Sequence, residues 1–109
     1  KPPIMLRPPY GLYEPFQRAK VNLPIIMWTV DTKDWTGKTP SVVLSAIKKD
    51  VRPGAIILMH DIHSPSVDAA EVLIPKLIAS GYQLVTVSEL AKYRSVAMYS
   101  GGVYNAFYR

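Results

Sequence analysis

The sequence has 109 residues, the size of a single domain, and its 49% apolar content excludes a disordered chain. It contains no cysteine and no apolar run long enough to span a bilayer, which excludes disulfide bonds, thiolate metal sites and a transmembrane segment within these residues. The net charge of +5 arises from scattered basic residues, which argues against nucleic-acid binding and leaves a modest preference for anionic polymers.

The first half of the chain predicts two strands, a helical turn and a longer helix. Short apolar runs place strands at residues 4–6 and 24–30, with a helical turn at 14–21 between them. Thr39 is a natural N-cap and Pro40 suits the first helical position, so a helix begins there. An Arg-Pro-Gly sequence ends this helix.

The second half continues the alternation of strands and helices. An apolar run predicts a strand at residues 55–59, and a weaker run predicts another at 83–87. A helix at 67–80 lies between them, and Pro75 inside it should kink or break it. A short helix follows Ser88.

This order predicts an α/β fold in which right-handed crossovers place parallel strands side by side, with helices outside. The runs at 24–30 and 55–59 lack clean alternation, as expected of parallel strands covered on both faces. Such strand–helix units make up half of a (β/α) barrel. We therefore expect the strands and helices of this chain to form half of such a barrel, which would not be a self-sufficient fold. Residues 95–109 form a tail whose conformation the sequence does not predict.

Polar residues follow each of the first three strands directly. Arg7 follows the first, Asp31 and Asp34 follow the second, and His60 and Asp61 follow the third. In a parallel barrel all strand carboxyl ends open on one face. These groups are therefore expected to converge at a single rim.

Three motifs at these strand ends carry a family resemblance. They are RPPYG at 7–11, VDTKDW at 30–35 and LMHDIH at 58–63. In this order they resemble the third, fourth and fifth motifs of the polysaccharide deacetylase family, which is carbohydrate esterase family four with a NodB-type domain. The similarity covers residues 5–93, and the sequences of the motifs are most similar to those of bacterial peptidoglycan N-acetylglucosamine deacetylases.

The resemblance also implies what this chain lacks. Members of the family bind a divalent metal, often zinc, through one Asp and two His, and a neighbouring Asp is the general base. Those groups belong to the motifs T-F-D-D-G and H-x-x-x-H, and neither string is present. The expectation is therefore no metal ligand in this chain, no activity by the chain alone, and an N-terminal fragment of the same domain as its partner. The resemblance thus implies that residues 1–94 form the C-terminal half of a distorted (β/α) barrel, completed by that missing N-terminal fragment.

Catalytic roles follow from the resemblance, residue by residue. His60 resembles the general acid that protonates the departing amine, and Asp34 resembles the carboxylate that orients it. Arg7 resembles the cation that holds the absent base in place. The Tyr10 backbone N–H resembles the oxyanion donor. The small slot for the acetyl methyl and the sugar face would be shaped by Pro9, Tyr10, Trp35 and Leu58.

Several residues have simpler structural interpretations. Arg7 without its motif would be a surface cation, and Trp28 within a strand belongs to the core. Asp31 is expected to brace its loop. His63 invites a metal interpretation through the string HDIH, but a structural or pocket-edge role is favoured because no third ligand is evident nearby.

The resulting functional expectation is a hydrolase that removes N-acetyl groups from N-acetylglucosamine residues of a cell-wall polysaccharide, with peptidoglycan as the expected polymer. The alternatives are a deacetylase acting on chitin oligomers or acetylated xylan, and a non-catalytic carbohydrate-binding remnant of the same fold. Such a protein would be extracellular or associated with the cell wall, with membrane anchoring through an upstream segment as an option.

Overall fold

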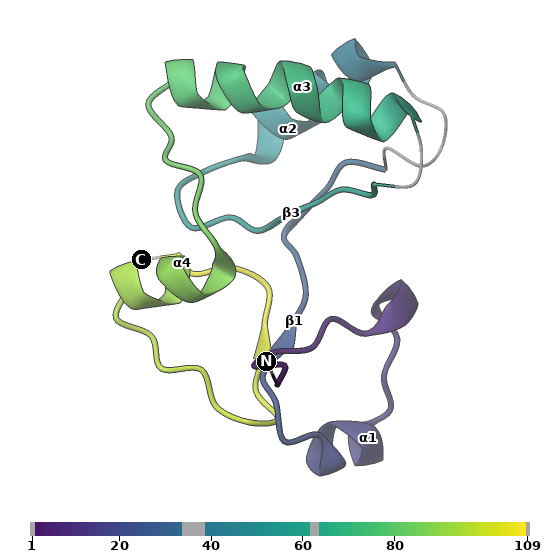
Figure 1. The fold of residues 1–109 in the computed structure, drawn as a ribbon, viewed down its shortest axis with the longest axis vertical. Coiled ribbons are helices and arrows are strands. Elements are labelled where there is room, and N and C mark those ends of the chain that lie inside the picture. The colour runs from purple at the N-terminus through teal and green to yellow at the C-terminus, as the bar shows by residue number, and fades with distance from the viewer. Residues whose placement is uncertain (1, 34–38, 62–63, 109) are drawn as a thin grey trace.

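The computed structural model describes residues 2–33, 39–61 and 64–108 (Figure 1). Within them no helix is long and apolar enough to cross a membrane. The elements in chain order are a 3₁₀ turn η1 (Pro9–Gly11), α1 (Pro15–Lys20), β1 (Ile25–Ile26), β2 (Val30–Asp31), α2 (Pro40–Asp50), β3 (Ile57–Leu58), α3 (Ser64–Ala79), α4 (Val87–Tyr93) and β4 (Val103–Tyr104).

The named strands pair in parallel, as the alternation of strands and helices predicts. β2 pairs with β3, with Val30 opposite Ile57. β1 pairs with β4, and a single parallel bridge joins Leu6 to Ile25 on the other edge of β1. β1 and β2 are thus two pieces of the strand predicted at 24–30, and each piece has its own neighbour. The α/β class with parallel strands is confirmed.

Two apolar clusters cover opposite faces of the strands. Ile56 belongs to one cluster and Ile57 packs against the other, because successive side chains of a strand point to opposite faces. The buried members of the helix-side cluster are Val30, Val43, Leu44, Ile47, Ala69, Leu73 and Leu77. The buried members of the tail-side cluster are Ile26, Ile56, Ala91 and Phe107. Burial on both faces was predicted from the missing alternation.

The two long helices lie side by side on the helix-side cluster, at one end of the molecule (Figure 1). α2 begins after Thr39 as expected. α3 begins at Ser64, earlier than predicted, and continues through Pro75 without a break. Gly81 follows α3 with a φ of 92°, in the left-handed region that favours glycine, and it ends the helix.

The prediction of a strand at residues 83–87 is wrong. Within the described residues, segment 82–86 has no regular structure, and Val87 already belongs to α4. α4 begins with a capping box in which Thr86 and Glu89 exchange side-chain and backbone hydrogen bonds. A strand also needs a hydrogen-bonded neighbour, and an apolar pattern does not show whether one is present.

The tail supplies structure that its sequence did not predict. β4 pairs with β1, and Phe107 is only 3% exposed within the tail-side cluster. The Phe107 N–H donates to the Gly54 carbonyl at 2.8 Å, and a Cβ at Gly54 would lie 2.3 Å from the Phe107 oxygen. Glycine at position 54 therefore allows the tail to approach the start of β3 this closely.

Candidate functional site

The first motif forms a tight turn at η1. Its two hydrogen bonds run from the Gly11 N–H to the Pro8 carbonyl (3.0 Å) and from the Leu12 N–H to the Pro9 carbonyl (3.2 Å). Pro8 is buried beneath the turn, whereas Pro9 is exposed and the Tyr10 side chain is 94% exposed. The turn thus presents Pro9 and Tyr10 to the surroundings, where a ligand can reach both.

Tyr10 has an unusual backbone conformation. Its φ of 58° and ψ of 10° lie in the left-handed region, which costs a residue with a side chain about 1–2 kcal/mol. Its backbone N–H makes no hydrogen bond to any residue that the structure describes. Strained backbone of this kind is concentrated at functional sites. The turn therefore leaves the N–H that was predicted as oxyanion donor available, although that role stays a prediction.

Gly11 allows the turn to pack closely against the Trp28 ring. Its φ is 68°, and a Cβ there would lie 2.7 Å from the Trp28 ring atom Cη2, so no larger residue fits without displacement. Trp28 lies between β1 and β2, is half-buried and packs against the tail-side cluster, so it contributes to the core but is neither within a strand nor fully buried as predicted. The Asn105 side-chain amide donates to the Trp28 carbonyl at 3.3 Å. The tail thus helps to fix Trp28, on which the turn packs. The sequence analysis did not predict this contact.

The Arg7 side chain lies against the carboxyl end of β1. Its Nε donates to the Ile26 carbonyl (3.4 Å) and an Nη donates to the Met27 carbonyl (3.3 Å). Although the residue is exposed overall, partial burial of the guanidinium lowers the pKa of Arg7. The group remains a cation at neutral pH because an arginine pKa starts far above it. Two carbonyl contacts hold the cation at a strand end, which is more order than a free surface arginine would have.

The ends of β2 and β3 are tied together by side chains. The buried Thr32 hydroxyl donates to the Leu58 carbonyl at 3.0 Å. The Asp31 carboxylate accepts the Lys33 N–H at 2.9 Å, so Asp31 braces its loop as expected. Leu58 is buried, and His60 is half-buried two residues after it. His60 therefore follows a strand end that the Thr32 hydrogen bond holds in place, and its role as general acid stays a prediction.

Three of the predicted residues lie outside the described part of the chain: Asp34, Trp35 and His63. The pairing of Asp34 with His60 and the contribution of Trp35 to a sugar-binding slot therefore stay predictions. Among the described residues, no group of three or more His, Cys, Asp or Glu side chains is placed to hold a metal ion.

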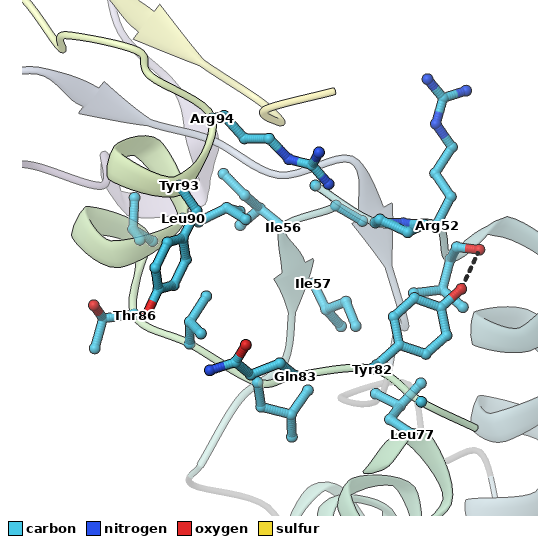
Figure 2. A pocket seen from close by; sticks show the side chains of 18 of the residues that line it. Arg52, Ile56, Ile57, Leu77, Tyr82, Gln83, Thr86, Leu90, Tyr93 and Arg94 are labelled. Atoms are coloured by element: carbon cyan, nitrogen blue, oxygen red, sulfur yellow. Dashed lines mark hydrogen bonds between the residues drawn. The ribbon is translucent and has the colours of Figure 1, made fainter. Parts of the chain in front are cut away.

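A cavity of about 660 Å³ opens between β3 and segment 81–87 (Figure 2). Arg7 lines it, but His60 does not belong to its lining. Arg52 and Arg94 also line it, and none of the described lining residues is acidic. Convergence of Arg7 and His60 on one cavity mouth thus stays a prediction. Arg52 and Arg94 were missed because a single arginine after a helix carries no sequence signal of a cavity.

No family model matches the chain. The peptidoglycan N-acetylglucosamine deacetylase PgdA of Listeria monocytogenes is 39% identical over 88 residues, which are 81% of this chain and 19% of PgdA. A solved T48 deacetylase with substrate superposes with a TM-score of 0.86 at 38% identity, over 94% of this chain and 51% of that one. This chain belongs to the polysaccharide deacetylase family.

A second solved structure of the family is also similar to this chain. A family 4 acetyl xylan esterase from Clostridium thermocellum, in complex with a cobalt ion, has a TM-score of 0.88 at 29% identity over 97% of this chain and 54% of that one. The chain thus spans about half the length of these solved relatives, and corresponds to a fragment of their domain.

Proposed function

We propose that this chain is part of a deacetylase domain that hydrolyses N-acetyl groups on N-acetylglucosamine residues of peptidoglycan. The observation that carries the proposal is the turn at Tyr10, which holds a strained backbone N–H that has no partner among the described residues. The similarity to PgdA favours peptidoglycan as the polymer.

The chemistry assigned to this chain is proton donation and charge stabilisation. When water adds to the amide carbonyl, negative charge develops on the carbonyl oxygen, and the Tyr10 N–H donates to it. The carbon–nitrogen bond then breaks, and His60 gives a proton to the departing nitrogen. The products are acetate and a free amine on the sugar. Arg7 contributes a fixed positive charge beside the reaction centre.

A divalent metal, zinc in this proposal, would supply an activated water. The described residues provide no suitable ligand set, so no ligand and no step is assigned to this metal in the present chain. The metal ligands and the general base would come from the N-terminal half of the domain, and this chain by itself would be inactive. Because peptidoglycan lies outside the cell membrane, we place the complete protein at the cell wall or outside the cell.

A second candidate substrate is acetylated xylan. The high TM-score to the acetyl xylan esterase favours it, because that relative covers almost this whole chain. Ester and amide hydrolysis share the oxyanion donor, but protonation of the leaving group matters more for an amine than for a sugar hydroxyl. The two substrates should therefore differ in their dependence on His60.

The decisive experiment replaces His60 by alanine in the complete domain and measures acetate release. With an N-acetylglucosamine oligomer as substrate, we expect kcat to fall by about 10²–10⁴-fold with little change in KM, since loss of a general acid affects the transition state. Val42→Ala on the exposed surface of α2 is the control and should keep full activity. An unchanged rate for His60→Ala would remove His60 from the mechanism. Faster release from acetylated xylan than from the oligomer by the unmodified domain would favour the second substrate.

A further inference from the structure

The Tyr10 turn depends on a contact outside its own segment. Its two internal hydrogen bonds close the turn, but they do not fix where the turn lies. A Cβ at Gly11 would lie 2.7 Å from Cη2 and 3.5 Å from Cζ2 of the Trp28 ring, so the backbone of the turn rests directly on that ring. A strained residue such as Tyr10 keeps its conformation only where surrounding contacts hold it. The position of the Trp28 ring therefore bears on the Tyr10 N–H.

The tail holds the backbone of Trp28. The residues on either side of Trp28 are fixed by backbone bonds: the Met27 N–H donates to a carbonyl of β4 at 2.8 Å, and the Thr29 N–H donates to the Ile56 carbonyl at 3.0 Å. Within the described ranges, the Trp28 backbone itself makes one hydrogen bond, which its carbonyl accepts from the Asn105 side-chain amide at 3.3 Å. Asn105 follows β4, which runs beside β1 (Figure 1). One tail side chain thus fixes the peptide from which the ring extends.

The tail also contacts the helix that follows the turn. α1 begins only four residues after Gly11, and the Nε of Arg18 in α1 donates to the Gly101 carbonyl at 2.6 Å. The Gly101 N–H donates to the Leu23 carbonyl at 3.1 Å. A hydrogen bond from a charged donor is stronger than one between neutral groups. The tail is therefore anchored close to the turn on a second side, and its contact with Trp28 is not an isolated touch of a loose end.

We propose that Asn105 is a positioning residue for the Tyr10 N–H and acts through Trp28 and Gly11. The amide of Asn105 fixes the Trp28 peptide, and packing of the ring against Gly11 transmits that position to the turn. The inference rests on the proposed function, in which the Tyr10 N–H donates to the oxyanion. Such a donor works when it lies about 2.7–3.1 Å from the oxyanion, so a small displacement of the turn lowers the rate. Asn105 needs no contact with substrate for this effect.

The kinetic test replaces Asn105 by leucine in the complete domain. Leucine has a similar size, donates no hydrogen bond and adds no charge, and the backbone bonds of Met27 and Thr29 remain. With an N-acetylglucosamine oligomer, we expect kcat to fall by about 3–10-fold at unchanged KM, because one neutral hydrogen bond is lost and the oxyanion contact exists only in the transition state. Asn105→Gln keeps the amide donor and should recover most of the rate. Tyr99→Ala, at another exposed tail position, should keep the full rate.

Proton NMR of the same variants tests the link without using deacetylation. The Gly11 α-protons lie against the Trp28 ring, and the ring current displaces their chemical shifts. In Asn105→Leu these shifts should move toward those of an exposed glycine, whereas in Asn105→Gln and Tyr99→Ala they should stay. The Met27 amide should remain protected from exchange in all three variants, because its partner is a backbone carbonyl of β4. This protection shows that the tail is still in place.

A double-mutant cycle tests the proposed route. Gly11→Ala separates the turn from the ring, because the added Cβ clashes with Cη2 of Trp28. If Asn105 acts through this contact, Asn105→Leu should lower kcat no further in the Gly11→Ala background. Equal fold-losses in both backgrounds would show that Asn105 acts by another route and would contradict the inference.

The remaining contrary outcomes are equally definite. Unchanged Gly11 shifts in Asn105→Leu overturn the inference, and so do altered shifts with an unchanged kcat. Loss of Met27 protection in that variant would show a general loosening of the tail in place of a positioning role. If the unmodified domain releases no acetate, the proposed function fails, whereas the Gly11 shifts still decide whether Asn105 holds the turn.

Discussion

The two faces of the strands are assembled in different ways. The helix-side cluster uses side chains from one continuous stretch of the chain, from β2 through α2 and β3 to the end of α3. The tail-side cluster joins Ile26, Ile56, Ala91 and Phe107, which are far apart in the sequence. The turn at Tyr10 adjoins the tail side through Trp28, whereas the cavity is lined from both sides, by Leu77 of the helix-side cluster and by Leu90, which packs against the tail-side cluster. The turn proposed as oxyanion donor therefore depends on long-range contacts more than the helical layer does.

The largest expected effect comes from breaking the tail side with Phe107→Ala. Loss of this buried ring should lower the free energy of unfolding by about 3–5 kcal/mol. Amide exchange should accelerate first at Ile25 and Met27, because their N–H groups donate to the tail carbonyls of Gly102 and Tyr104. The Val30 amide, bonded to Ile56, should keep more of its protection.

Two further variants make the comparison specific. Ile47→Ala, in the helix-side cluster, should cost about 2–5 kcal/mol without selectively exposing the Ile25 amide. Tyr99→Ala, at an exposed tail position, should change stability little. Equal acceleration at Ile25 and Val30 in Phe107→Ala would show that the two faces unfold as one unit.

A smaller effect of opposite sign is expected on the helix side. Ser66 in α3 is 1% exposed, and its hydroxyl has no hydrogen-bond partner among the residues that the structure describes. A buried polar group without a partner costs about 1–3 kcal/mol, so Ser66→Ala should raise the free energy of unfolding by on the order of 1 kcal/mol. Urea denaturation measures this change. A loss of stability would mean that the hydroxyl has a partner in solution.

The smallest expected effect is the pH dependence of the cap of α4. The Thr86 backbone N–H and hydroxyl donate to the Glu89 carboxylate (3.1 and 2.9 Å), and they lower the pKa of Glu89. A lowered carboxyl pKa stabilises the fold above the ordinary glutamate value of about 4.3 and loses that contribution as pH falls through the folded value. Glu89→Gln should therefore be less stable than the unmodified chain at pH 7 and equal to it at strongly acidic pH. Urea midpoints at both pH values would test this, and a difference that persists in acid would contradict it.

Much of the helical layer could be predicted from local signals. Thr39 and Pro40 mark the start of α2, and the apolar runs around Val30 and Ile57 mark the parallel pair. These signals work because helix caps, glycine conformations and burial of both strand faces depend on residues close in sequence. The family motifs were recognisable for the same reason, since each is a short string at one strand end.

Long-range contacts decided the rest. The pairing of β4 with β1, the burial of Phe107 and the support of Trp28 by Asn105 depend on segments that only folding brings together. Segment 83–87 shows the converse: its sequence favours a strand, but residues 83–86 have no regular structure and pair with no described strand, and Val87 belongs to α4. Local pattern determined which residues can form an element, whereas the tertiary structure decided which of them found a partner, because a strand is stabilised by another strand and not by its own sequence.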